Sequence, residues 1–147
     1  MANDLTLPVR RASLKALKAN ALLTALVPAP SIYPQTVPPT PAWPFVKMGS
    51  PTPTPVRASC VDGAAAIFAV HGFAKARING AGGMLETAED LASRIGSAIA
   101  SALDRQRLVL DGGQSARVLW TGSQLMQDGD EADAYHAVVN FKVRVLA

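Results

Sequence analysis

Residues 134–145 read AYHAVVNFKVRV, and the alternation within this stretch decides the fold class. Apolar or aromatic residues occupy every second position, at Tyr135, Ala137, Val139, Phe141, Val143 and Val145. The positions between them are mostly polar or charged, as at His136, Asn140, Lys142 and Arg144. Successive side chains of a strand point to opposite faces, so this period predicts a long β-strand with one face buried and one face mostly polar.

The segment before this strand predicts a second long strand. Residues 107–110 and 115–124 are separated by Asp111-Gly112-Gly113, which indicates two antiparallel strands joined by a turn. A dense acidic run then precedes residue 134, and its charged members are Asp128, Asp130, Glu131 and Asp133. We expect this run to form a solvated hairpin tip that is able to meet a basic surface of a partner.

Another hairpin is predicted in the middle of the chain. Residues 56–60 and 64–73 flank Asp62-Gly63, a dipeptide that favours a two-residue hairpin turn. Residues 79–83 read NGAGG, which indicates a flexible turn before the next element.

Two amphipathic helices are expected. Pro8 suits the first turn of a helix over Thr6–Leu26, which Pro28 ends. Thr87-Ala88-Glu89-Asp90 resembles a capping box that opens a second helix ending near Leu103. The apolar stripes of the two helices contain Leu14, Leu17, Ala21 and Ala25 in the first, and Leu91, Ile95, Ala98, Ile99 and Ala102 in the second. The order helix, strands, helix, strands predicts an α+β domain with a mostly antiparallel β-sheet and two main helices packed on one face.

All prolines except Pro8 lie between Pro28 and Pro55. We expect a single domain over residues 1–147. Within it we expect a proline-rich extended loop at 28–55, because proline has no N–H to donate to a sheet. Residues 45–49 are the one plausible strand within this loop, at an edge of the sheet. The loop also contains aromatic residues that need something to pack on, namely Tyr33, Trp43 and Phe45.

Composition narrows the classes of function. The chain has 147 residues, a formal net charge of +3 and one cysteine, Cys60. One cysteine forms no intrachain disulfide and no cysteine-rich metal site. We expect no secretory signal and no membrane partner, since no apolar run approaches the ~20 residues of a membrane span. Folding in a reducing cytoplasm is therefore expected.

No arrangement of residues predicts an enzyme, a metal or a cofactor. His71 and His136 lack the spacing of metal-binding pairs, and we expect both to be solvent-facing or interface residues. Gly83 is not followed by the Lys and Ser or Thr of a phosphate-binding loop. The acidic run has Val139 at the twelfth position, where a calcium loop needs a bidentate Glu, so only a looser divalent site stays open.

A candidate basic face lies on the first helix, at Arg10, Arg11, Lys15 and Lys18. Such a face is able to contact DNA phosphates or an acidic neighbouring subunit without reading sequence. An ordinary solvated helix face is the favoured interpretation, because a proline-rich segment follows where a helix-turn-helix would have a short turn and a second helix.

The order of these segments resembles a family of phage tail-completion proteins that includes the siphophage tail terminators. The matching segments are the Leu- and Ala-rich residues 12–26, Ser31-Ile32-Tyr33, Val37-Pro38-Pro39, Pro44 to Gly49, the helix 86–103 and the acidic turn and strand 130–145. The resemblance covers nearly the whole chain. Residues 51–55 and 76–83 depart from the family pattern.

The resemblance implies a structural virion protein of the tail or neck. It implies a homo-oligomer, a hexameric ring that caps the tail tube at its head-proximal end and joins it to the head-side connector. Phage DNA would pass through this ring without specific recognition, and assembly would take place in the bacterial host cytoplasm.

Two groups of residues are expected as the subunit or neck interface of such a ring. One group consists of the aromatic residues Tyr33, Trp43 and Phe45 in the proline-rich loop. The other consists of the acidic residues Asp128, Asp130, Glu131 and Asp133. The alternatives are a head-completion (stopper or adaptor) protein of the neck, and a DNA-binding module that uses the basic face.

Overall fold

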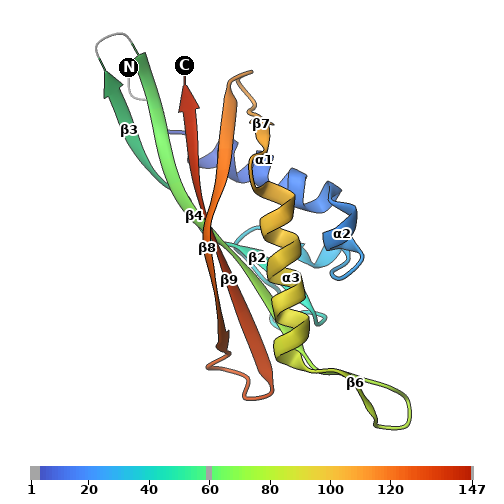
Figure 1. Ribbon diagram of the computed structural model, residues 1–147. Coiled ribbons are helices and arrows are strands. Elements are labelled where there is room, and N and C mark those ends of the chain that lie inside the picture. The colour runs from blue at the N-terminus through green and yellow to red at the C-terminus, as the bar shows by residue number, and fades with distance from the viewer. Residues whose placement is uncertain (1–3, 59–60, 147) are drawn as a thin grey trace.

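The computed structural model describes residues 4–58 and 61–146, and Figure 1 shows their arrangement. The helices in chain order are α1 (Thr6–Ala19), α2 (Ala21–Thr24), the 3₁₀-helix η1 (Ala29–Ser31) and α3 (Ala88–Leu103). The strands are β1 (Ile32–Tyr33), β2 (Phe45–Met48), β3 (Thr52–Ala58), β4 (Val61–Lys75), β5 (Arg77–Ile78), β6 (Met84–Glu86), β7 (Arg107–Val109), β8 (Ser115–Gln127) and β9 (Ala134–Leu146).

The main sheet has the strand order β1-β2-β4-β9-β8-β7. β4 is long enough to pair with β3 along residues 61–67 and with β2 along residues 70–73. β1 and β2 run parallel, whereas the other pairs of this sheet are antiparallel. β5 and β6 form a separate two-stranded sheet. The structure is thus an α+β fold whose mixed sheet is mostly antiparallel, as the segment order predicts.

The alternation predicted for residues 134–145 is present in β9 from Ala137 to Val145, whereas Ala134 is buried and Tyr135 is half-buried. Ala137, Val139, Phe141, Val143 and Val145 are buried. Asn140, Lys142 and Arg144 between them are exposed. The buried set faces α3, which contacts β9, β4 and β8. We call the opposite side of the sheet the open face.

Helix α3 packs very close to the sheet because glycines stand at two points of contact. Gly72 of β4 leaves room for Ile95 of α3, since a Cβ at residue 72 would lie 2.6 Å from Ile95 Cγ2. On the helix side, a Cβ at Gly96 would lie 3.1 Å from the Cβ of Ala137. The predicted cap is present, as Thr87 Oγ1 accepts a hydrogen bond from the Asp90 N–H at 3.2 Å. Figure 1 shows α3 running along the sheet, with α1 and α2 beside it.

The first helix is shorter than predicted. It breaks at Asn20, which has an extended backbone and whose side-chain oxygen accepts a hydrogen bond from the Leu23 N–H at 3.0 Å. Asparagine is favoured at this position because its side-chain oxygen accepts a hydrogen bond from an N–H group in the first turn of the helix, here α2, which has no other partner within the helix. The single helix over Thr6–Leu26 is therefore wrong. The break also turns the apolar stripe, so that Leu23 is buried while Ala21 is exposed.

The hairpin of β3 and β4 is present, but its turn is not at Asp62-Gly63. Asp62 lies inside β4 and pairs with Arg57. The two strands join through residues 59–60, which include Cys60 and lie outside the described residues. Gly63 also pairs with Leu146 of β9, so pairing on both sides of β4 outweighs the local turn preference of the dipeptide.

The proline-rich segment 28–55 contains regular structure in place of one extended loop. It holds η1, β1, β2 and the start of β3, and residues 34–44 run without helix or strand. Pro53 and Pro55 lie in β3, which pairs with β4 alone, and an edge strand tolerates proline. The strand predicted at 45–49 is confirmed as β2, but its edge position is wrong because β1 pairs with its outer side.

Replacing Gly72 by Ala should weaken the packing of α3 on the sheet. The added Cβ would overlap Ile95, so the helix or the strand must shift. We expect the free energy of unfolding, measured by urea denaturation, to fall by about 1–3 kcal/mol. Gly80→Ala is the matched control, because an added Cβ there has no neighbour within 4 Å. The control should change stability by less than about 0.5 kcal/mol, and equal losses in both variants would contradict the close approach.

Candidate interaction surfaces

A cluster of aromatic and histidine rings covers one end of the open face. Phe73 of β4 stacks on Phe45 of β2, with ring centroids 4.7 Å apart, and on His136 of β9, with centroids 4.2 Å apart. Trp43 and Tyr33 pack against Phe45 edge to face, at 4.8 Å and 6.2 Å. We call these rings, together with His71, the aromatic cluster.

The aromatic cluster brings together the three aromatic residues expected at an interface. Phe45 is only 6% exposed, so its main contribution is to hold the neighbouring rings. Tyr33 and Trp43 are partly exposed and form the outer part of the cluster. Stacked and edge-to-face rings stabilise one another beyond their burial, which makes this end of the sheet a rigid surface. A role of these residues in an interface stays a prediction.

The two histidines form a hydrogen-bonded pair within the cluster. His71 Nδ1 lies 2.7 Å from His136 Nε2, so one ring nitrogen donates and the other accepts. Burial lowers the pKa of His71 to about 4, and the nearby charges of His136 and Lys47 act in the same direction. Burial also lowers the pKa of His136, although Asp128 opposes this shift. Both rings are therefore neutral at pH 7. They are half-buried and paired, so the solvent-facing alternative expected from sequence is wrong, while the interface alternative stays a prediction.

Lys75 connects the aromatic cluster to the acidic run. Its Nζ lies 4.7 Å from the centroid of the Trp43 ring. The same Nζ lies 3.5 Å from Glu131 Oε2 and 3.9 Å from Asp133 Oδ1. The two groups of residues predicted as an interface are thus adjacent in the structure. Sequence reasoning missed Lys75 because strand register, rather than chain proximity, places it between them.

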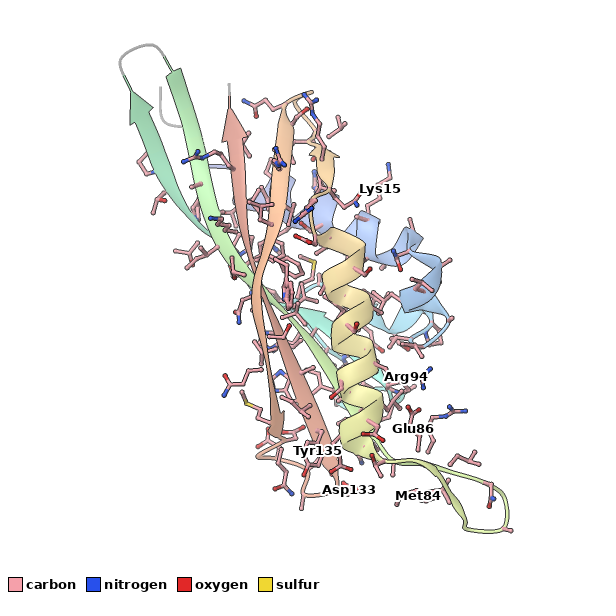
Figure 2. The ribbon with its side chains drawn as sticks, in the orientation of Figure 1. Lys15, Met84, Glu86, Arg94, Asp133 and Tyr135 are labelled. Carbon is pink, nitrogen blue, oxygen red and sulfur yellow. The ribbon has the colours of Figure 1, made fainter. Side chains whose placement is uncertain are left out.

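The acidic run forms the turn between β8 and β9, as predicted, and we call residues 128–133 the acidic turn. The Asp128 N–H donates to the Ala134 carbonyl oxygen at 2.9 Å, and Gln127 Nε2 donates to the Ala132 carbonyl oxygen at 2.7 Å. Asp128 Oδ1 also accepts a hydrogen bond from the Asp130 N–H at 3.1 Å. Figure 2 labels Asp133 at this end of the sheet. Asp130, Glu131 and Asp133 are exposed and Asp128 is partly exposed, and all four lie on this hydrogen-bonded turn.

The predicted basic face lies on α1, on the opposite side of the molecule from the open face. Arg11, Lys15 and Lys18 are exposed and Arg10 is partly exposed. Arg11 Nη1 contacts Asp111 Oδ2 at 3.2 Å, which ties α1 to the turn between β7 and β8. An exposed ion pair of this kind contributes little to stability.

Sequence reasoning missed a projecting arm, formed by β5, β6 and the turn between them (residues 77–86). Ile78, Met84 and Leu85 on it are each at least 60% exposed. Figure 2 shows Met84 on this hairpin, away from the sheet. The base of the arm is anchored to α3, where Arg94 Nη1 lies 2.7 Å from Glu86 Oε2. The signal in the sequence was the apolar pair Met84-Leu85, which directly follows the glycine-rich residues 79–83.

The turn of the arm is ordered by Asn79. Its side-chain oxygen accepts hydrogen bonds from the N–H groups of Ala81, at 3.0 Å, and Gly83, at 2.8 Å. Gly82 adopts a positive φ of 84°, which glycine permits without strain. The glycine-rich stretch is therefore a hairpin turn that presents the arm.

A partly unpaired strand lies on another side of the sheet. β7 pairs with β8 only at residues 115–117, so within the described chain residues 121–127 of β8 have no strand on their outer side. Leu125 and Met126 on this stretch are 42% and 37% exposed, and Trp120 directly before it is 47% exposed. Trp120 and Leu125 also line a groove of about 550 Å³ between β8 and α3. An unpaired edge with exposed apolar side chains is a favourable place for another chain to pair.

Within residues 4–58 and 61–146, no group of three or more His, Cys, Asp or Glu side chains is placed to hold a metal ion. None of the described helices has the length and apolar character needed to cross a membrane.

Known proteins resemble this chain in sequence pattern and in fold. A family model described as "Tail completion protein gp17" matches residues 11–146. A chain of the solved structure "Virion of native gene transfer agent (GTA) particle" is similar with a TM-score of 0.77 and 21% identity, over 99% of this chain and 100% of that chain. A second solved chain, which has no descriptive name, is similar with a TM-score of 0.55 and 18% identity, over 93% of this chain and 92% of its own. No curated protein matches the sequence. At these identities the structural likenesses show a shared fold.

The histidine pair predicts a loss of stability on mild acidification. Both folded-state pKa values lie below the ordinary value of 6.5, so the unfolded chain binds more protons than the folded chain between about pH 6.5 and pH 4. The stability that the neutral pair contributes is therefore complete above pH 6.5 and declines as the pH falls toward 4.

His136→Gln is the variant that tests this pH dependence, because its amide still offers a hydrogen bond to His71 but does not titrate. We expect the melting temperature of the variant to fall less steeply between pH 6.5 and 4 than that of the wild type. A titration of the imidazole resonances by NMR should give a pKa of about 4 for His71. Parallel melting profiles for the two proteins would show that the pair does not control the acid sensitivity.

Proposed function

Because the chain belongs to the gp17 family of tail completion proteins, we propose that it is a tail terminator, the subunit of a ring at the head-proximal end of a phage-type tail. We propose a hexamer of this chain that contacts the tail tube on one side and the head-side connector on the other. The role is structural and involves no catalysis. The similarity in fold between this chain and a chain of a gene transfer agent virion supports a place in a virion.

The projecting arm is the observation that carries the ring proposal. An isolated two-stranded hairpin is at best marginally stable in water, and this one has no third strand among the described residues. It nevertheless exposes Ile78, Met84 and Leu85 to solvent. Burying such side chains contributes roughly 1.5–3 kcal/mol each. An arm of this kind is best explained by a neighbouring subunit that covers it.

A closed ring also needs a second, different surface on each subunit. Head-to-tail contacts use two unlike patches that meet around the ring. The unpaired part of β8, with Leu125 and the adjacent Trp120, offers such a patch away from the arm. The arm of one subunit and the β8 edge of the next are therefore the proposed subunit contacts.

The aromatic cluster and the acidic turn are the proposed contacts to the tail tube or the connector. They lie together at one end of the open face, where Lys75 contacts both Trp43 and Glu131. The carboxylates of the exposed Asp130 and the partly exposed Asp128 are suited to a basic partner surface, and the rings of Tyr33 and Trp43 provide an apolar part. A contact with both features resembles protein interfaces, which combine aromatic anchors with a polar rim.

The double variant Ile78→Ser and Met84→Ser tests the arm. These residues face each other across the hairpin, and each is at least 60% exposed. We expect an unchanged melting temperature and a ring that dissociates at concentrations on the order of 100-fold higher than the wild type, since at least about 3 kcal/mol of burial is lost. The measurement is the mass of the purified protein, alone and bound to tail tube, by analytical ultracentrifugation.

Leu22→Ser is the matched control, because Leu22 is 67% exposed on α2 and lies outside the proposed contacts. The control should assemble like the wild type. Full ring assembly of the arm variant would overturn the proposed contact. Purified tails that never met a head should contain the protein, and its absence from them would favour the neighbouring head-completion role.

A further inference from the structure

A basic groove occupies the end of the open face away from the acidic turn. It has a volume of about 840 Å³ and lies over β4, β9, β8 and β7. Among the described residues, five cationic side chains line it: Arg105, Arg107, Arg117, Lys142 and Arg144. Its apolar floor includes Ile67, which is 64% exposed, and Leu119. We call this region the basic groove, and none of the predicted site residues lies in it.

The register of the sheet places three arginines in one row across the groove. Arg107 pairs with Arg117, and Arg117 pairs with Arg144. Like charges directly opposite each other on neighbouring strands destabilise a sheet. No carboxylate is among the described residues that line the groove, and Asp104 Oδ2 is 3.9 Å from Arg105 Nε at its rim. The isolated subunit thus holds a repulsion that a bound anion would relieve.

The dimensions and chemistry of the groove fit a repeating anion. Neighbouring strands lie about 4.8 Å apart and alternate residues of a strand about 6.6 Å apart, so the row of arginines and Lys142 span more than one carboxylate or phosphate. Four of the five cations are arginines, whose planar guanidinium binds phosphate oxygens in pairs. Among the described residues that line the groove there is no Asn or Gln to read base edges.

From these observations we infer that the basic groove binds the phosphate backbone of double-stranded nucleic acid, without reading its sequence. The groove is separate from the basic face of α1. The binding does not depend on ring formation, although a ring would repeat the groove once per subunit and add the contacts together.

The acidic turn of a second copy of this chain fits the basic groove less well than nucleic acid does. Two of its carboxylates, on Glu131 and Asp133, already contact Lys75 of their own subunit. A short turn also offers less length than the row of arginines and Lys142 occupies.

The test is fluorescence anisotropy of a short labelled DNA duplex with the purified protein, over about 50–200 mM salt. If all five cations contact phosphates, the slope of log affinity against log salt should be about −4.5 per subunit. The double variant Arg117→Gln and Arg144→Gln should lower the affinity at the lowest salt severalfold and reduce the slope by about 1.8. Its melting temperature should not fall, because a repulsion is removed.

Lys15→Gln with Lys18→Gln is the matched control, since it removes the same charge from exposed positions on α1. It should leave both affinity and slope close to the wild type. Equal losses in the two double variants, or no binding at low salt, would overturn the inference. Competition by polyglutamate as strong as that by unlabelled duplex would assign the groove to an acidic protein and would also overturn it.

The single variant Lys142→Gln is a second test of the groove. It should reduce the slope of log affinity against log salt by about 0.9. An unchanged slope in this variant counts against the groove even if the double variant is unstable. The mass of the ring is measured on the same proteins. Intact rings that do not bind DNA would overturn the inference about the basic groove and leave the proposed function in place.

Discussion

The antiparallel pairing of β4 with β9 is the constraint on which the rest of the structure depends. It runs from Gly63 opposite Leu146 to Lys75 opposite Ala134. This register sorts the side chains of both strands into a set that faces α3 and a set on the open face. A shift by one residue would exchange the two faces, so the packing of α3 over Gly72 fixes the register as much as the backbone hydrogen bonds do.

The same pairing divides the open face into two ends of unlike chemistry. The aromatic cluster and the acidic turn occupy the end at which β8 turns into β9, and the basic groove occupies the other end. The formal net charge of +3 conceals this separation, because opposite charges at the two ends largely cancel. Net charge alone therefore said little about partners, whereas the placement of the charges on one face says where partners of each kind can bind.

Local signals predicted the elements well where pairing and packing agreed with them. The alternation of residues 134–145 and the apolar stripe that ends near Leu103 both led to correct elements. Two local signals failed against competing interactions. Asp62-Gly63 favours a turn, but pairing with both neighbouring strands holds it inside β4. The apolar stripe of residues 6–26 favours one helix, but the Asn20 side chain caps the following helix and interrupts the first one.

The sequence by itself determined the α+β class, most strand and helix positions and the family resemblance, because periodicity and segment order are local properties of the chain. It also pointed to Trp43 and to the acidic residues as an interface. Only the tertiary structure decided that Lys75 joins them, that His71 pairs with His136, and that arginines of three strands form one row. These contacts join residues far apart in sequence, and strand register, which is set by packing over the whole sheet, brings them together.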